Sequence, residues 1–203
     1  AGTGIAPLNS GSTAVVEAPR PGQKLVMGQM TGGLSVDSWL SVVEFGFKIG
    51  PSKVLYTEEI DVTIDLTACQ PCFSVKFGNP AKYYKSYDNV TEVQGGGWGA
   101  AVHKAQSIDA KARPYRSCDI PMTVVSDVVD AKSKAVLLAA DSTLGYSTST
   151  TGWAPWEKFW NQCEKLGLTG GTVNVKLGFK TMKNSANNTW GIVTYELVLP
   201  ANA

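Results

Sequence analysis

Charged side chains and histidine are scarce in this sequence. Of its 203 residues 17% are charged, below the roughly 25% of an average soluble domain, and His103 is the single histidine. The 18 Lys and Arg balance the 17 Asp and Glu to a net charge of +1, whereas an autonomous nucleic-acid-binding protein is usually strongly basic. A surface this poor in charge is typical of secreted proteins and of subunits that neighbours cover.

Long apolar runs and recognisable catalytic motifs are also missing. No run approaches the ~20 apolar residues that cross a bilayer as a helix, so we expect no membrane partner. No phosphate-binding loop, nucleophile elbow or convincing set of metal ligands is found, and we therefore expect neither an enzyme nor a cofactor. The chain begins with Ala1 rather than Met, which indicates a product of a signal peptidase or a polyprotein protease.

The four cysteines form no clear redox or zinc motif. Cys69 and Cys72 have the C-x-x-C spacing, but they join two predicted strands and lack the helix N-terminus that lowers a thiol pKa. A zinc site would have to recruit Cys118, Cys163 or His103, which are scattered along the chain. A hairpin turn with free, buried thiols is the favoured interpretation. Two disulfides are the alternative.

What the sequence does contain is a period-two alternation of apolar and polar residues. Successive side chains of a strand point to opposite faces, so this pattern predicts sheets with one face in a core. Five stretches show it: 43–49, 60–66, 73–77, 173–179 and 193–199. We therefore predict an all-β fold, a single antiparallel β-sandwich of the jelly-roll type with two packed four-stranded sheets.

The remaining segments complete the expected organisation. Residues 1–24 are rich in Gly and Pro and are predicted to form an extended N-terminal arm, followed by the domain at 25–203. Early strands are expected at 38–49, 54–67, 73–78 and 118–129. Residues 79–117 lack periodicity and are predicted to be a functional or interface loop region. The apolar run Ala135–Ala140 fits either a short helix or a buried strand.

One segment has helical spacing instead. Its apolar residues recur on one helical face, Pro155 is placed to open a helix and Gly167 to close it. The sequence therefore predicts a helix at 155–166, in which these residues fall at helical spacing: Trp156, Phe159, Trp160, Cys163 and Leu166. Packing of Trp156 and Trp160 onto a sheet is favoured over a sugar-stacking or membrane-contact surface that would also include Trp153.

Three local features are candidates for binding. Gly95, Gly96, Gly97 and Gly99 favour a tightly turning loop over a phosphate cradle, because no Gly-Lys-Ser/Thr follows. His103 has no nucleophile motif around it and is interpreted as a structural histidine. A loose basic cluster beside Tyr115 could hold single-stranded nucleic acid if the protein lines the inside of a shell, although a solvated loop is favoured. Its candidate RNA-facing residues are Lys104, Lys111, Arg113 and Arg116.

The segment from Trp156 to Phe179 resembles a known family. Phe159-Trp160-Asn161-Gln162-Cys163 and, about ten residues on, Val173-Asn174-Val175-Lys176-Leu177-Gly178-Phe179 are similar to the late strands of the small capsid protein of comoviruses and fabaviruses. The resemblance implies a jelly-roll subunit that assembles with a larger, two-jelly-roll capsid protein into an icosahedral shell around single-stranded RNA. It implies a virion location in a plant virus and no catalytic residues. In that family the first matching segment is a strand, where the spacing here predicts a helix.

Two other functions stay open. Ile120-Pro121-Met122-Thr123-Val124, Leu144-Gly145-Tyr146-Ser147 and Gly191-Ile192-Val193-Thr194-Tyr195 look like bacterial fimbrial subunits, secreted proteins in which an N-terminal extension completes a neighbour's sheet. A carbohydrate-binding sandwich using the tryptophans is the third possibility.

Overall fold

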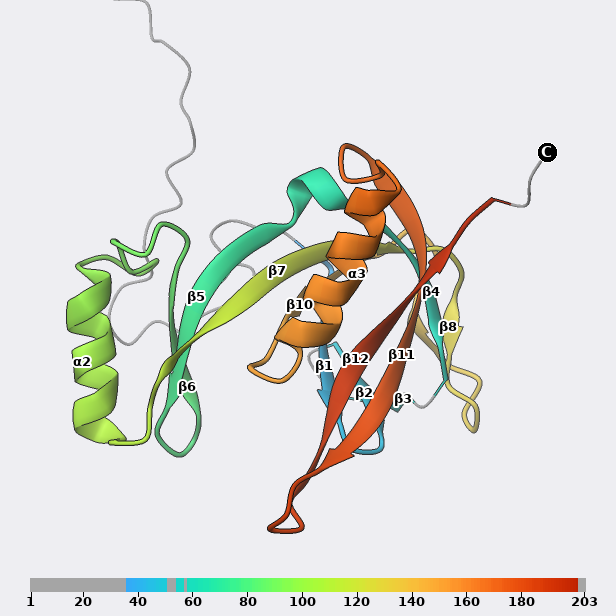
Figure 1. The fold of residues 1–203 in the computed structure, drawn as a ribbon. Coiled ribbons are helices and arrows are strands. Elements are labelled where there is room, and N and C mark those ends of the chain that lie inside the picture. The colour runs from blue at the N-terminus through green and yellow to red at the C-terminus, as the bar shows by residue number, and fades with distance from the viewer. Residues whose placement is uncertain (1–35, 51–53, 57, 201–203) are drawn as a thin grey trace, which may run out of the picture.

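The computed structural model describes residues 36–50, 54–56 and 58–200, so the arm predicted at 1–24 lies outside the described residues. Most regular structure in these ranges is β-strand (Figure 1). The strands are β1 (Ser38–Val43), β2 (Gly46–Ile49), β3 (Val54–Tyr56), β4 (Ile60–Asp65), β5 (Gln70–Phe77), β6 (Lys82–Ser86), β7 (Pro114–Val124), β8 (Val128–Val129), β9 (Val136–Leu138), β10 (Thr143–Ser147), β11 (Thr172–Lys183) and β12 (Thr189–Val198). The helices are the 3-10 turn η1 (Leu66–Ala68), α2 (Trp98–Ile108) and α3 (Trp153–Lys165).

The strands form one large mixed sheet. Ten of them are joined in the order β12-β11-β4-β7-β10-β1-β2-β3, with β5 on β7 and β6 on β5, while β8 and β9 make a separate pair. Every ladder is antiparallel except that of β1 with β10, which is parallel. The all-β prediction is confirmed at this level. The sheet differs from the prediction in carrying a parallel ladder and in not dividing into two separate four-stranded sheets.

The large sheet curls until its two ends meet. The Phe47 and Phe179 rings lie edge to face at 5.5 Å, and the Thr181 hydroxyl donates a hydrogen bond of 2.7 Å to the Glu44 carbonyl. A Cβ placed on Gly191 would lie 2.0 Å from the carbonyl oxygen of Val43. The β1–β2 hairpin therefore packs directly on the β11–β12 hairpin, at a seam that only glycine permits at position 191.

The main core fills the inside of this curl. Alternation along β4 buries Ile60, Val62 and Ile64 while Asp61 and Asp65 face solvent. The long strands β7 and β11, which flank β4 in the sheet, contribute further core residues, and with β10 they add Ile120, Met122, Val124, Leu144, Val175 and Leu177. Burial of this apolar surface is the principal stabilising term, at about 25 cal/mol per Å².

Helix α3 covers one side of the core, as the sequence predicted. Trp156 and Phe159 are buried, and both rings lie 5.4 Å from that of Tyr195 on β12. Gly167, at φ +69°, ends the helix because the Leu168 N–H reaches back to the Cys163 carbonyl at 2.9 Å. The helix begins at Trp153, two residues before Pro155, and its tryptophans pack inward rather than forming an exposed surface.

Helix α2 was not predicted and forms a smaller cluster of its own. It packs on β5 and β6 at one end of the molecule (Figure 1). Its buried residues are Trp98 and Ala105, which meet Val75 and Phe77 of β5. The expectation that 79–117 is irregular was therefore wrong. Mostly small or polar side chains on α2 left too weak a helical pattern in the sequence.

Three other local predictions need correction. Residues 38–49 form a hairpin rather than one strand, and Phe45 is 66% exposed in its turn. Cys69 and Cys72 do not lie in a hairpin turn, since β4 pairs with β11 and β7 whereas β5 pairs with β6 and β7. The run Ala135–Ala140 contains the short strand β9, in which only Leu138 is buried. All four cysteines are free thiols, as favoured.

Candidate functional site: a pocket between β1 and β10

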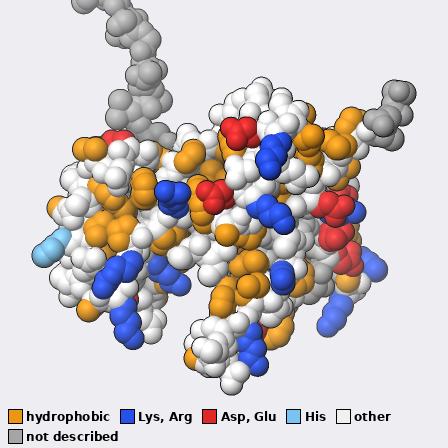
Figure 2. Space-filling view, viewed as in Figure 1, with side chains coloured by type: hydrophobic (Ala, Val, Ile, Leu, Met, Phe, Trp, Pro, Cys, Tyr) orange, Lys and Arg blue, Asp and Glu red, His pale blue; other side chains and the backbone are white. Residues whose placement is uncertain are grey.

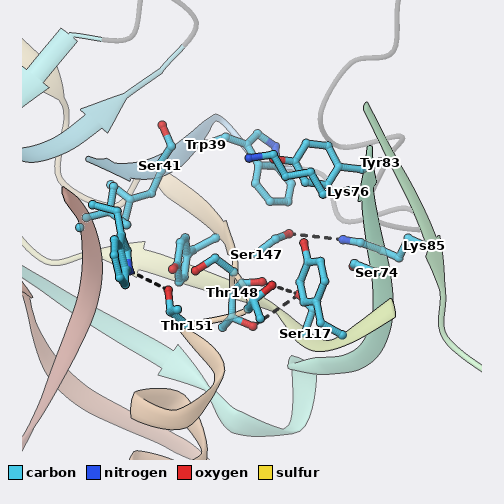
Figure 3. Close-up of a pocket in the computed structure, with 18 of the residues that line it drawn as sticks. Trp39, Ser41, Ser74, Lys76, Tyr83, Lys85, Ser117, Ser147, Thr148 and Thr151 are labelled. Atoms are coloured by element: carbon cyan, nitrogen blue, oxygen red, sulfur yellow. Dashed lines mark hydrogen bonds between the residues drawn. The ribbon is translucent and has the colours of Figure 1, made fainter. Parts of the chain in front are cut away.

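A pocket of about 610 Å³ opens between strands that come from distant parts of the chain. One wall is Trp39–Val42 of β1, the other is formed by β5, β6 and β7, and residues 146–151 lie between them. Its surface is mostly apolar. The aromatic lining residues are Trp39, Tyr83, Tyr115, Tyr146 and Trp190 (Figure 3).

The Trp39 ring can pack closely against β10 because Gly145 has no side chain. A Cβ at that glycine would lie 3.1 Å from three atoms of the indole. Trp39 is paired in register with Gly145, so the ring lies flat over the neighbouring strand and remains largely buried. Lys76 and Tyr83 form a cross-strand pair on the opposite wall, near Trp39 in Figure 3.

A buried charge network supports the base of the pocket. Asp119 on β7 is fully buried, and its carboxylate accepts hydrogen bonds from Lys85 Nζ at 2.5 Å, Ser147 Oγ at 2.5 Å and the Tyr87 hydroxyl at 2.6 Å. Burial and the Asp119 carboxylate raise the pKa of Tyr87 well above its ordinary value. Burial also raises the pKa of Cys72 to about 11, with Asp119 adding to the shift, so this thiol is protonated at neutral pH.

The loop after β10 is tied to β7 by hydroxyl groups. Ser117 Oγ donates to the Thr148 carbonyl at 2.7 Å, and Thr148 Oγ1 accepts from the Cys118 N–H at 2.9 Å. Trp190 Nε1 donates to Thr151 Oγ1 at 3.0 Å and joins the same loop to β12. The bonds of Thr148 with Ser117 and of Thr151 with Trp190 are drawn as dashed lines in Figure 3.

Two further side chains that line the pocket, Glu92 and Tyr146, are buried with few hydrogen-bond partners. Glu92 accepts a 2.8 Å hydrogen bond from the Gln94 N–H, and burial raises the pKa of its carboxyl. The Tyr146 hydroxyl has no hydrogen-bond partner of ordinary geometry among the described residues. Burial raises its pKa to about 12, although the adjacent Ser149 lowers it in part. The pocket therefore presents apolar rings with a few polar atoms, the usual composition of a binding site.

The basic residues selected from the sequence lie elsewhere. Lys104 is on α2, Lys111 and Arg113 are in the loop that follows, and Arg116 is on β7, all exposed. Tyr115 and Ser117 line the pocket, so alternation along β7 turns Arg116 to the other face of the sheet, where α2 packs. Arg113 donates to the carbonyls of Ala110 and Ala112. An RNA contact by these residues stays a prediction.

Sequence reasoning did not identify the pocket residues. Trp39 and Trp190 carry no motif, and Lys85, Asp119 and Ser147 are brought together only by the sheet topology. His103 is exposed on α2 and remote from these groups in sequence. Within the described ranges, no three His, Cys, Asp or Glu side chains are grouped to hold a metal ion. No described helix is both long and apolar enough to cross a membrane.

Comparison of the chain with models of known protein families, with curated proteins and with solved structures found no match in any of the three.

Proposed function

We propose that this protein is a structural subunit of a viral capsid, which assembles with a larger capsid protein into an icosahedral shell around single-stranded RNA. Its place would then be the virion of a plant virus, and its activity would be assembly rather than catalysis. Closed symmetry makes many individually weak contacts jointly stable, so such a subunit needs contact surfaces on several sides.

The distribution of exposed apolar side chains is the observation that carries this proposal. Phe45 in the β1–β2 turn is 66% exposed and Val90 beside α2 is 70% exposed. Val129 and Val136 form an exposed cross-strand pair on β8–β9, and Leu199 follows β12. Figure 2 shows hydrophobic side chains in several separate groups on one face, among mostly neutral atoms. Single exposed apolar residues are common on protein surfaces, so it is their grouping, as in the Val129–Val136 pair, that supports contact with protein neighbours.

A jelly-roll relationship is the finer part of the proposal. The curl brings β1 and β2 over β11 and β12, so two arms of one sheet face each other across a common core. Two sheets that pack in this way are the basis of a jelly roll. The exposed basic residues 104–116 on the α2 side would then be the surface available to RNA.

A secreted fimbrial or adhesin subunit that polymerises by strand addition is the alternative. It is favoured by one observation, a stretch of β1 beside the pocket that pairs with β2 alone among the described strands, because a donated strand needs an open edge. Both proposals require self-association, and they differ in whether the product is closed or filamentous.

Substitution in an exposed apolar pair tests the assembly proposal. Val136 is 53% exposed, so Val136→Asp should leave the fold intact but place a charge in a subunit contact. We expect the wild-type protein to assemble and Val136→Asp to require at least tenfold higher concentration, measured by light scattering coupled to size exclusion.

Ser185→Asp, in the exposed β11–β12 turn, is the matched control and should assemble like the wild type. A wild-type protein that stays monomeric up to millimolar concentration would refute the assembly proposal. If both variants assemble equally well, the Val129–Val136 pair of β8–β9 is not part of a subunit contact.

A further inference from the structure

One wall of the pocket is a face of the three strands β6, β5 and β7. Alternation along β5 directs Val75 and Phe77 to the α2 side and leaves the residues between them facing the pocket. The pocket-facing residues of this wall form cross-strand pairs: Tyr83 with Lys76, Lys85 with Ser74, and Ser74 with Tyr115. The other wall includes Trp39 of β1, so aromatic rings project into the space from both walls.

Many polar groups of the lining are already bonded to the protein. Ser117 Oγ donates to the Thr148 carbonyl, and the Lys85 ammonium and Ser147 hydroxyl are both bonded to Asp119. The hydroxyl oxygens of the loop after β10 accept hydrogen bonds from the protein as well: Thr148, Ser149 and Thr151. A sugar needs several free donors and acceptors around each ring, whereas an apolar body matches this lining.

The charge that the lining leaves without a partner lies at the mouth of the pocket, on Lys76. Lys85 is neutralised by its buried ion pair, and burial raises the pKa of the Glu92 carboxyl, which favours its uncharged form. No carboxylate among the described residues lies within 4 Å of Lys76 Nζ. Lys76 is exposed and lies beside Trp39 and Tyr83 (Figure 3). A ligand that carries a single negative charge next to an apolar body fits this arrangement.

We propose that the pocket binds a planar aromatic carboxylic acid, with its ring system among the rings of the two walls and its carboxylate at Lys76 Nζ. Aromatic rings attract one another in offset-stacked and edge-to-face arrangements beyond the effect of buried area, which favours an aromatic over an aliphatic body. A single carboxylate suits one exposed ammonium, whereas a phosphate group offers more acceptors than this mouth can pair. A volume of about 610 Å³ is typical of pockets that hold small ligands and admits a fused ring system.

This site is separate from the exposed apolar residues assigned to subunit contacts, so ligand binding and assembly are tested independently. Binding of the acid is expected whether or not the protein assembles.

Titration of the full-length protein with 2-naphthoate tests the proposal. Isothermal titration calorimetry at low salt compares it with 2-naphthamide, which has the same rings without the charge, and with decanoate, which has the charge without a ring. We expect 2-naphthoate to bind with a single site per chain and about fivefold more tightly than either of the other two. Added salt should weaken the binding of 2-naphthoate and leave that of 2-naphthamide unchanged.

Variants at exposed positions locate the binding site. Lys76→Met removes the charge but keeps an unbranched side chain, and Lys82→Met is the matched control because Lys82 alternates to the other face of β6 and does not line the pocket. We expect Lys76→Met to weaken 2-naphthoate binding about fivefold without affecting 2-naphthamide, and Lys82→Met to affect neither. Tyr83→Leu, at a position that is 39% exposed, should weaken both naphthyl ligands but not decanoate.

Each contrary outcome overturns a defined part of the proposal. Absence of saturable 2-naphthoate binding up to millimolar concentration would refute the ligand site. Equal affinities of the Lys76→Met and Lys82→Met variants for 2-naphthoate would show that Lys76 does not hold the carboxylate. Tighter binding of decanoate than of 2-naphthoate would replace the aromatic class with an aliphatic acid. Unchanged binding of both naphthyl ligands in Tyr83→Leu would place them outside this pocket.

Discussion

The buried carboxylate of Asp119 connects the side chains at the base of the pocket through hydrogen bonds and an ion pair. It neutralises Lys85, whose side chain is only 11% exposed, and it also accepts from Ser147 and Tyr87. A buried ion pair of this kind adds little net stability compared with apolar residues, but removing one partner leaves the other charge buried and uncompensated.

Asp119→Asn should therefore lower the free energy of unfolding by about 3 kcal/mol, because the Lys85 ammonium loses its counter-charge. Lys85→Met combined with Asp119→Asn should recover part of that loss, since the uncompensated charge is gone. Urea denaturation of both variants measures the effect. A loss below about 1 kcal/mol for the single variant would mean that Lys85 finds another partner or water.

At the residue scale, the sequence could identify buried cysteines and core positions but not this network. The thiols of Cys72, Cys118 and Cys163 are buried and free; Cys118 and Cys163 lie in the main core, whereas Cys72 lies beside Ser117 and Asp119. Asp119, in contrast, lies among apolar neighbours on β7 with no motif around it. Its partners at 85 and 147 come from strands that only the tertiary fold places alongside β7.

At the element scale, the seam between β1 and β12 closes the curl of the sheet. The β12 backbone at Gly191 touches the β1 backbone at Val43, and the β11 residue Thr181 bonds the turn after β1. Because the obstructing atoms belong to the backbone, a side chain at 191 cannot be accommodated by a rotamer change.

Gly191→Ala should lower the free energy of unfolding by about 2–3 kcal/mol, as expected for overpacking of a close contact. Gly170→Ala is the matched control, since a Cβ there meets nothing within 4 Å, and should change stability by less than about 0.5 kcal/mol. Thermal denaturation followed by circular dichroism compares the two. Equal stability of both variants would show that the seam is looser than described.

The elements that the sequence predicted well are those with a strong local signal. β11, β12 and α3 have long, regular apolar patterns, and α3 also has Gly167 to end it. Prediction failed where local pattern and topology disagree. Phe45 continued an alternating pattern through what is a turn, and α2 offers too few apolar residues to reveal its face.

At the scale of the whole molecule, the sequence indicated a β-rich chain with a core but could not give the strand order. The parallel ladder of β1 with β10 joins residues more than 100 positions apart. The pocket opens where these two strands cease to pair. Strand order depends on long-range pairing, which alternation does not encode. The exposed apolar sites are the observation on which the proposed function in assembly rests.

Electron microscopy of the native, unmodified protein in negative stain tests the assembly function most directly. The account predicts closed isometric particles, which contain nucleic acid when recovered from their natural source. Filaments would replace the capsid function with the fimbrial alternative. Dispersed monomers at every concentration would contradict the assembly function and leave the aromatic pocket as the site to study.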